Sequence, residues 1–64
     1  GKVMIDVFDY EGKNVAIECN NGKKYKGKVN WCARAEDIDE KSDLIAVNGT
    51  GVLKDEIKSI EILD

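Results

Sequence analysis

The 64-residue sequence has no proline, no histidine and no long hydrophobic run. Its longest uninterrupted apolar stretch is residues 44–47, whereas a transmembrane helix needs about 18 or more apolar residues. No segment resembles a signal peptide, so we expect a cytoplasmic protein with no membrane partner. Without histidine, the chain lacks the commonest general base and metal ligand.

Cysteine is also scarce, and the two that are present do not predict a metal site. Cys19 and Cys32 have no second cysteine pair and no histidine to complete a zinc site. Disulfides are rare in cytoplasmic proteins, so we expect both thiols to be small buried hydrophobic side chains. Ser42 and Ser59 have no evident base partner, and no nucleotide-binding glycine motif is present. The sequence therefore predicts neither an enzyme nor a cofactor.

Charge is unevenly distributed along the chain. Ten Lys and Arg residues against thirteen Asp and Glu residues give a net charge of −3. Residues 13–34 carry a net charge of +5, and residues 35–64 carry −6. Such asymmetry is typical of a chain with an electrostatic partner, which is either a nucleic acid or the opposite end of another copy. Two solvated faces are the simpler alternative.

We expect residues 1–64 to form a single domain, because the chain is too short for two. A domain of about 60 residues buries only about 60% of its unfolded surface. Domains of this size are often supported by a disulfide, a metal or a partner subunit. Since the first two are not indicated, self-association is the predicted support.

Most of the chain has the period of two that is typical of β-strands. We predict strands over residues 15–19, 24–31, 44–47, 52–53 and 57–63, with the Gly in the middle of the second strand marking a bend. In the last strand, Ile60 and Ile62 are expected to face the core. Asn and Gly residues at 20–22 and 48–51 indicate tight turns, and 54–56 indicates another, with one helical turn as an option. Residues 36–43 hold five acids and one Lys and are predicted to be a solvated loop.

The N-terminal stretch fits two interpretations. Val3, Ile5 and Val7 alternate like a strand, while Asp6 and Asp9 are spaced like the polar face of a helix. We expect a short helix over residues 4–10. Five strands in about fifty residues close most economically as a small, strongly bent antiparallel barrel, which is a mainly β fold.

This pattern resembles the Sm-like family of small barrels with Src-homology-3-like topology. The run from Asn21 to Val29 has the order of the family's first motif: a polar-Gly turn, a basic residue, an aromatic residue, a Gly and an aliphatic residue. The run from Val52 to Ile60 is similar to the second motif, although Lys54 and Asp55 stand where the family carries Arg-Gly. The resemblance covers residues 4–64.

The resemblance implies a leading helix, a bent five-stranded barrel and assembly into rings. In such rings the fourth strand of one subunit pairs with the fifth strand of the next, and single-stranded RNA binds around the pore. It also implies that the subunit interface involves residues of the last two strands: Val52, Leu53, Ile57, Ile60 and Ile62.

Lysines on one strand face form the sharpest candidate site. Lys24, Lys26 and Lys28 alternate along the second predicted strand, about 7 Å apart, because a strand rises about 3.3 Å per residue. With Arg34 and Lys54 they are the candidate RNA-binding residues. The alternative is that an amphipathic strand simply needs a polar face. Tyr25 and Trp31 could stack on bases, but their alternation with Val29 predicts that they pack in the core.

Two functions follow from these patterns. The first is a cytoplasmic, oligomeric binding module that contacts single-stranded RNA weakly through its basic residues. The second is a protein-interaction or assembly domain that uses an open barrel edge and has no nucleic-acid role. The acidic C-terminal half favours the second function, and the family resemblance favours the first.

Overall fold

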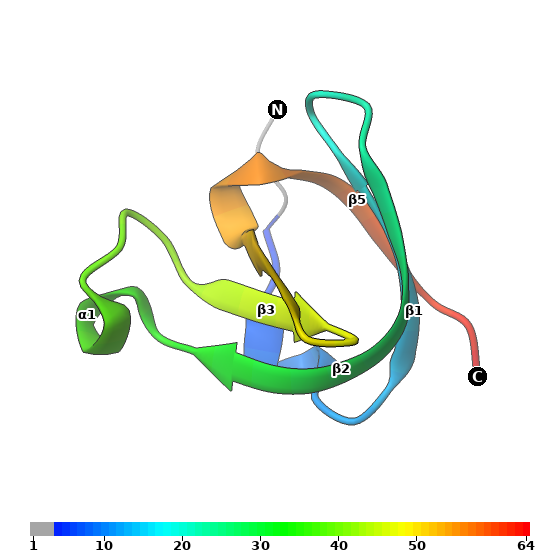
Figure 1. Ribbon diagram of the computed structural model, residues 1–64, viewed down its shortest axis with the longest axis horizontal. Helices are drawn as coiled ribbons and strands as arrows, with labels where there is room; N and C mark the ends of the chain where they lie inside the picture. The colour runs from blue at the N-terminus through cyan, green and yellow to red at the C-terminus, as the bar shows by residue number, and fades with distance from the viewer. Residues whose placement is uncertain (1–3) are drawn as a thin grey trace.

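The computed structural model describes residues 4–64, so Val3 of the alternating N-terminal pattern lies outside the described residues. The elements in chain order are η1 (Val7–Tyr10), β1 (Asn14–Cys19), β2 (Lys24–Ala33), α1 (Ala35–Ile38), β3 (Leu44–Val47), β4 (Thr50–Leu53), η2 (Lys54–Glu56) and β5 (Ile57–Ile62) (Figure 1). In this part of the chain, no helix is both long and apolar enough to cross a membrane.

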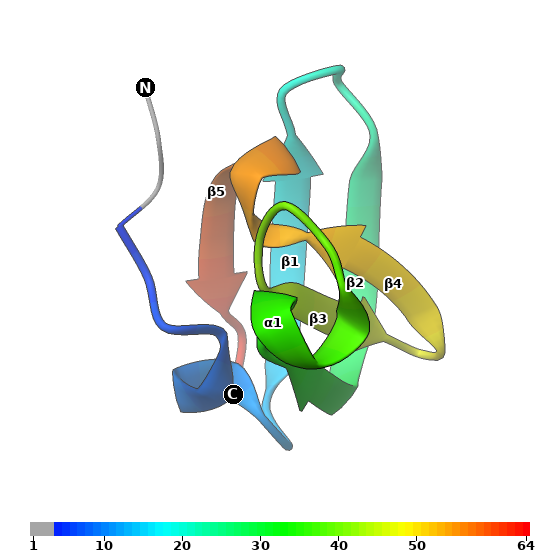
Figure 2. The same ribbon diagram turned by 90° about the vertical axis from the view of Figure 1, so that its left-hand side faces the viewer.

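All five strands belong to one strongly bent antiparallel sheet. Its strand order is β4-β3-β2-β1-β5, and β2 curves so far that it is shared between two halves of the sheet (Figures 1 and 2). The predicted mainly β, five-stranded, bent fold is therefore confirmed. Within residues 4–64 the sheet stays open, because β4 and β5 are its two edges and do not pair with each other.

Gly27 lies near the point where β2 passes from its pairing with β1 to its pairing with β3, which begins at Val29. Gly27 has φ +150°, which residues with a side chain rarely adopt. The amide group of Asn48 occupies the space where a Cβ of residue 27 would lie, and its Nδ2 donates a hydrogen bond to the carbonyl of Lys26 (3.4 Å). Glycine therefore allows the β3–β4 turn to dock against the bent strand.

The β3–β4 turn is shorter than the turn predicted over residues 48–51: it consists of Asn48 and Gly49, and β4 begins at Thr50. Asn48 and Gly49 both have positive φ, 50° and 84°, and Val47 pairs with Thr50 across them. This is the geometry of a type I′ turn, whose twist matches that of the flanking strands.

The core consists of small aliphatic and thiol side chains. The buried cluster is Val7, Val15, Ile17, Cys19, Val29, Cys32, Ile45, Val47, Val52 and Ile57. Both cysteines are free and buried, which confirms their predicted role as small hydrophobic residues. The Cys32 thiol also donates a hydrogen bond to the carbonyl of Val7 (3.3 Å), which ties η1 to β2.

A β-bulge changes the face on which Trp31 lies. Val29 pairs with Val47, but the next cross-strand pair is Trp31 with Ala46, so one residue of β2 is left without a partner. The bulge inverts the alternation, so that Cys32 joins the core and Trp31 is 52% exposed. The prediction that Trp31 packs in the core is therefore wrong.

The inward-facing residues of β5 are covered to different degrees. Ile57 pairs with Cys19, and its side chain is buried and belongs to the core. Ile60 packs partly against the core, whereas Ile62 is 45% exposed despite facing the buried Val15. Ile62 is left open because β4 does not close the sheet beside β5.

The N-terminal helix is shorter than predicted. It is a 3-10 helix over Val7–Tyr10, because the Asp6 carboxylate accepts a hydrogen bond from the backbone N–H of Phe8 (3.1 Å) and so caps its start. Residues 4 and 5 precede this cap and are not helical. Val7 enters the core, and Gly12, with φ +80°, follows before β1 begins.

The acidic segment 36–43 is only partly a loop. One turn of α-helix, α1, spans Ala35–Ile38, and it begins where the Asp43 carboxylate accepts a hydrogen bond from the backbone N–H of Ala35 (2.9 Å). Glu36 and Asp37 in the first turn suit the positive end of a helix. The predicted solvated loop is therefore restricted to the residues after α1.

Candidate nucleic-acid interface

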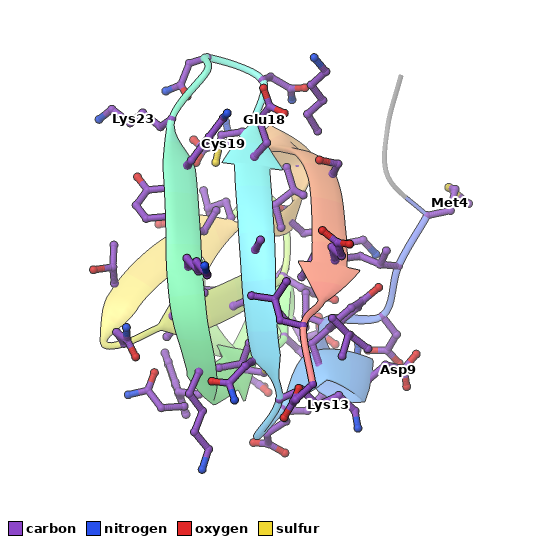
Figure 3. The ribbon with its side chains drawn as sticks, turned by 90° about the vertical axis from the view of Figure 1, so that its right-hand side faces the viewer. Met4, Asp9, Lys13, Glu18, Cys19 and Lys23 are labelled. Atoms are coloured by element: carbon purple, nitrogen blue, oxygen red, sulfur yellow. The ribbon has the colours of Figure 1, made fainter. Side chains whose placement is uncertain are left out.

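Lys24, Lys26 and Lys28 form a row on the outer face of β2, which we call the lysine ridge. All three are exposed, while the alternating residues Tyr25 and Val29 face inward. Figure 3 views this outer face, with β2, β1 and β5 side by side. Alternate residues of a strand lie about 7 Å apart. The ridge therefore presents three ammonium groups at intervals comparable with those of phosphates in an extended nucleic-acid strand.

Neighbouring strands place both neutral and acidic residues beside the ridge. Lys24 faces Glu18 across the β1–β2 pair, Lys26 faces Ala16, and Lys28 faces Asn14. The small Ala16 side chain leaves a shallow hollow of about 300 Å³, walled by Lys24 and Lys26 on one side and by β5 residues Ser59 and Glu61 on the other. The basic character of this face is therefore strongest along β2 and decreases toward β5.

None of the ion pairs found in residues 4–64 involves the ridge. These pairs are Arg34–Asp6, Arg34–Asp43 and Lys41–Asp55. The three ridge ammonium groups thus have no carboxylate within 4.0 Å in the described structure, and their charge is directed to solvent.

Arg34 lies in a different environment and is already engaged. Its guanidinium contacts Asp6 (3.1 Å) and Asp43 (3.2 Å), and it stacks over the ring of Phe8 at 4.4 Å from the centroid. These contacts connect the N-terminal segment to the loop after α1. Arg34 therefore acts as a structural link, and two carboxylates offset its charge.

Hydrogen bonds lower the pKa of both carboxyl groups in this cluster. The pKa of Asp6 is lowered mainly by the hydrogen bond from the backbone N–H of Phe8 and next by the hydrogen bond from Arg34. The pKa of Asp43 is lowered mainly by the hydrogen bond from the backbone N–H of Ala35, and Arg34 contributes again. The same pairing raises the pKa of Arg34, chiefly through its hydrogen bond with Asp6. All three groups are therefore charged at neutral pH.

Lys54 is also separate from the lysine ridge. It lies in η2 beside an open groove of about 570 Å³ that runs between the N-terminal segment, the loop after α1 and η2. Asp6, Asp43 and Asp55 line the same groove, so the surroundings of Lys54 are acidic. The structure brings together three of the five predicted basic residues and places Arg34 and Lys54 elsewhere.

All five predicted interface residues lie on the edge strands β4 and β5, where the side chains of Val52 and Ile57 are buried. At the end of the β3–β4 pair, the backbone N–H of Lys54 donates a hydrogen bond to the carbonyl of Asp43. At the end of the β1–β5 pair, the backbone N–H of Leu63 donates a hydrogen bond to the carbonyl of Asn14. Because antiparallel ladders alternate, the backbone groups of Leu53 on β4, and of Ile60 and Ile62 on β5, are directed away from their sheet neighbours.

Two features of the site could not be recognised in advance. The Asp6–Arg34–Asp43 cluster joins residues far apart in sequence, and no local motif marks it. The exposure of Trp31 depends on the bulge beside it, and no local signal marks that bulge, because Asn30 and Trp31 continue the regular alternation of polar and apolar residues in the sequence.

Comparison of the chain with protein-family models, with curated proteins and with solved structures gives no significant match. The resemblance to the Sm-like family therefore stays a prediction, which rests on the motifs in the sequence.

Proposed function

We propose that this chain is an Sm-like assembly and binding module that contacts single-stranded RNA through the lysine ridge. The observation that carries the proposal is the row of three exposed lysines on the outer face of β2, without carboxylate partners in the described structure. Lysine ammonium groups bind phosphates as point charges and do not read bases, so the expected contact is electrostatic and tolerant of sequence.

The number of lysines sets the strength of the expected salt dependence. Single-stranded nucleic acids release about 0.7 counterions per neutralised phosphate, so three contacts predict a slope of about −2 in a plot of log affinity against log salt. Affinity should then fall about 20-fold between 50 and 200 mM salt. Binding of this kind is weak, in keeping with the carboxylates of Glu18 and Glu61 on the neighbouring strands.

A charge-matched pair of variants tests the ridge. The first is Lys26→Glu/Lys28→Glu, and the second is Lys41→Glu/Lys58→Glu, which changes the net charge by the same amount at lysines outside the predicted RNA-binding set. Anisotropy of an end-labelled oligo-uridine at low salt should show binding for the wild type and the second variant, but not for the first. Equal loss in both variants, or retained affinity in the ridge variant, would contradict the proposal.

We also propose that copies of the chain assemble through the open edges of the sheet. Unpaired edges are templates for strand addition, and here β4 and β5 both lack a partner within residues 4–64. The half-exposed side chain of Ile62 lies at the β5 edge and would gain cover from a neighbouring β4. Pairing of β4 with β5 of the next copy is the arrangement that the family resemblance implies.

Solution mass measured by light scattering tests this assembly. The wild type should have a mass of several subunits, and Ile62→Lys should lower it, because a charge pointing into an edge contact opposes strand pairing. Glu61→Lys is the control, since Glu61 lies on the outer face and pairs with Ala16. A monomeric wild type would contradict the proposed assembly.

The second candidate function is a protein-interaction domain without a nucleic-acid role. The open edges favour it as well, because they accept a strand from any suitable partner. The absorbance ratio at 260 and 280 nm of the purified protein separates the two functions: retained nucleic acid supports the first, whereas a clean protein that ignores oligo-uridine supports the second.

A further inference from the structure

Among the described residues, Trp31 is the one large aromatic side chain that the sheet directs outward from its longest strand. It is 52% exposed, although the chain's small core is otherwise built from Val, Ile and Cys. The bulge responsible is held in place, because the Asn30 side chain accepts a hydrogen bond from the backbone N–H of Gly49 in the β3–β4 turn (3.2 Å). Bulges commonly aim a side chain in a new direction.

The bulge puts the indole on the same outer face as the lysine ridge. Lys24, Lys26 and Lys28 face outward before the bulge, and Trp31 faces outward after it. At about 3.3 Å per residue, Trp31 lies roughly 10 Å beyond Lys28 along the strand. The outer surface of β2 is therefore a basic row that ends in an exposed aromatic ring.

Small residues lie directly across from the indole on the neighbouring strands. On β3, the residue that pairs with Trp31 is Ala46. Ala46 in turn pairs with Gly51 on β4. The side chain of Leu44 lies beside Gly51. Ala46 is only 5% exposed although it shares the outward direction of Trp31, as expected if the indole covers it. Trp31 therefore lies across from a small residue and is about half exposed to solvent.

We propose that Trp31 stacks on a base of the single-stranded RNA whose phosphates follow the lysine ridge. This inference rests on the proposed function and adds a residue and a contact to it. Cationic tracks that end in aromatic platforms are the usual way in which proteins hold single strands without reading their sequence. Trp31 lies seven residues after Lys24, which is about 23 Å along the strand at about 3.3 Å per residue. A single strand of about four nucleotides would cover this length.

The continuity of the ridge with the indole favours RNA over a protein partner. An apolar protein contact would need no basic row beside it, whereas a nucleic-acid strand offers both a phosphate chain and flat base surfaces. A role of Trp31 in contacts between protein chains is the competing outcome of the test.

The chain contains a single tryptophan, so its fluorescence reports on this residue alone. Titration of the full chain with a six-nucleotide oligo-uridine at low salt should quench the emission, with the same midpoint as anisotropy of the labelled oligonucleotide. Trp31→Ala should weaken binding about 5- to 160-fold, the range expected for one lost base stack. Trp31→Phe should restore part of the affinity, because a phenyl ring also stacks.

The salt slope separates this role from that of the lysines. Trp31→Ala removes no phosphate contact, so the slope of log affinity against log salt should be unchanged, whereas loss of a ridge lysine reduces it. Leu63→Ala, which shortens an apolar side chain of similar exposure beyond β5, is the control and should change neither affinity nor slope. Thermal unfolding of each variant shows that it is folded.

Three results would overturn the inference. Binding by anisotropy without quenching, together with normal affinity of Trp31→Ala, would leave the ridge proposal standing and remove Trp31 from it. A change in solution mass of Trp31→Ala without a change in RNA affinity would assign the residue to a protein contact. Absence of oligonucleotide binding by the wild type at low salt would remove the RNA function itself.

Discussion

Replacement of Gly27 by alanine is expected to destabilise the protein far more than replacement of a glycine in an open turn. The new Cβ would lie 2.7 Å from Cγ and 2.9 Å from Oδ1 of Asn48, and φ at this position is +150°. The unfavourable φ costs about 1–3 kcal/mol. The clash adds at most about 3 kcal/mol, because the Asn48 amide is the end of an exposed side chain that can move. Displacement of Asn48 also removes its hydrogen bond to the Lys26 carbonyl, worth about 1 kcal/mol.

Gly22→Ala is the matched control. Gly22 also has positive φ, at +90°, but nothing lies within 4 Å of the place that its new Cβ would take. It should therefore show only the conformational cost of about 1–3 kcal/mol. The difference between the two variants isolates the contact with Asn48. It amounts to about 1–4 kcal/mol, so we expect Gly27→Ala to unfold about 4–30 °C below Gly22→Ala, at about 4–8 °C per kcal/mol.

The double variant Gly27→Ala/Asn48→Gly separates the two causes at residue 27. Glycine accepts the φ of +50° found at position 48, and its lack of a side chain removes the steric conflict. Urea unfolding should therefore show the double variant to be more stable than Gly27→Ala, and about 1 kcal/mol less stable than Gly22→Ala because the hydrogen bond from Asn48 to the Lys26 carbonyl is absent. If Gly27→Ala is as mild as Gly22→Ala, or if Asn48→Gly restores nothing, the steric explanation for glycine at residue 27 is refuted.

Three further predictions concern charge and thiol chemistry. Asp6 and Asp43 have lowered pKa values in the folded state, so the unfolded state binds more protons near pH 4. The stabilisation from these carboxylates is therefore present above that pH and is lost as the pH falls further. Urea unfolding midpoints measured between pH 5 and 2.5 should show this loss. Arg34→Gln should weaken this dependence only in part, since the backbone N–H groups of Phe8 and Ala35 remain; an unchanged pH profile would exclude Arg34 as a contributor. Burial raises the pKa of both cysteine thiols, so iodoacetamide at pH 7.5 should modify them only after unfolding, and rapid modification of the folded protein, read by mass spectrometry, would contradict the packing described. Lys26→Gln should reduce the salt slope of oligo-uridine binding by about 0.7, and an unaltered slope would remove that lysine from the contact.

Most of the fold can be predicted from the sequence because its signals are local. The strand predicted over residues 44–47 has the boundaries that the structure shows, and the Asn-Gly pair after it forms a tight turn. Gly27 lies near the place where β2 changes partners for a physical reason, since only glycine fits its φ and the contact with Asn48. The lysine ridge follows from simple alternation within one strand.

The misplaced residues share a different cause, which is dependence on distant partners. The sequence predicts Trp31 to be in the core because alternation alone does not reveal a bulge, and the bulge depends on pairing with β3. The burial of Ile62 depends on whether another strand lies beside β5. The start of α1 depends on the Asp43 carboxylate, which accepts a hydrogen bond from the backbone N–H of Ala35 eight residues earlier. Arg34 resembles the lysines in the sequence because its carboxylate partners are remote along the chain.

The place of β1 in the sheet has a consequence for synthesis of the chain. β1 lies between β2 and β5, so one of its neighbours follows almost immediately and the other only at residues 57–62. While the ribosome makes the intervening segment, the free side of β1 has no partner, and Val15, Ile17 and Cys19 lack part of their final cover. Chains interrupted before residue 57 should therefore be prone to aggregation and to exchange of strands with one another, so the timing of the last strand matters for yield of the protein in cells.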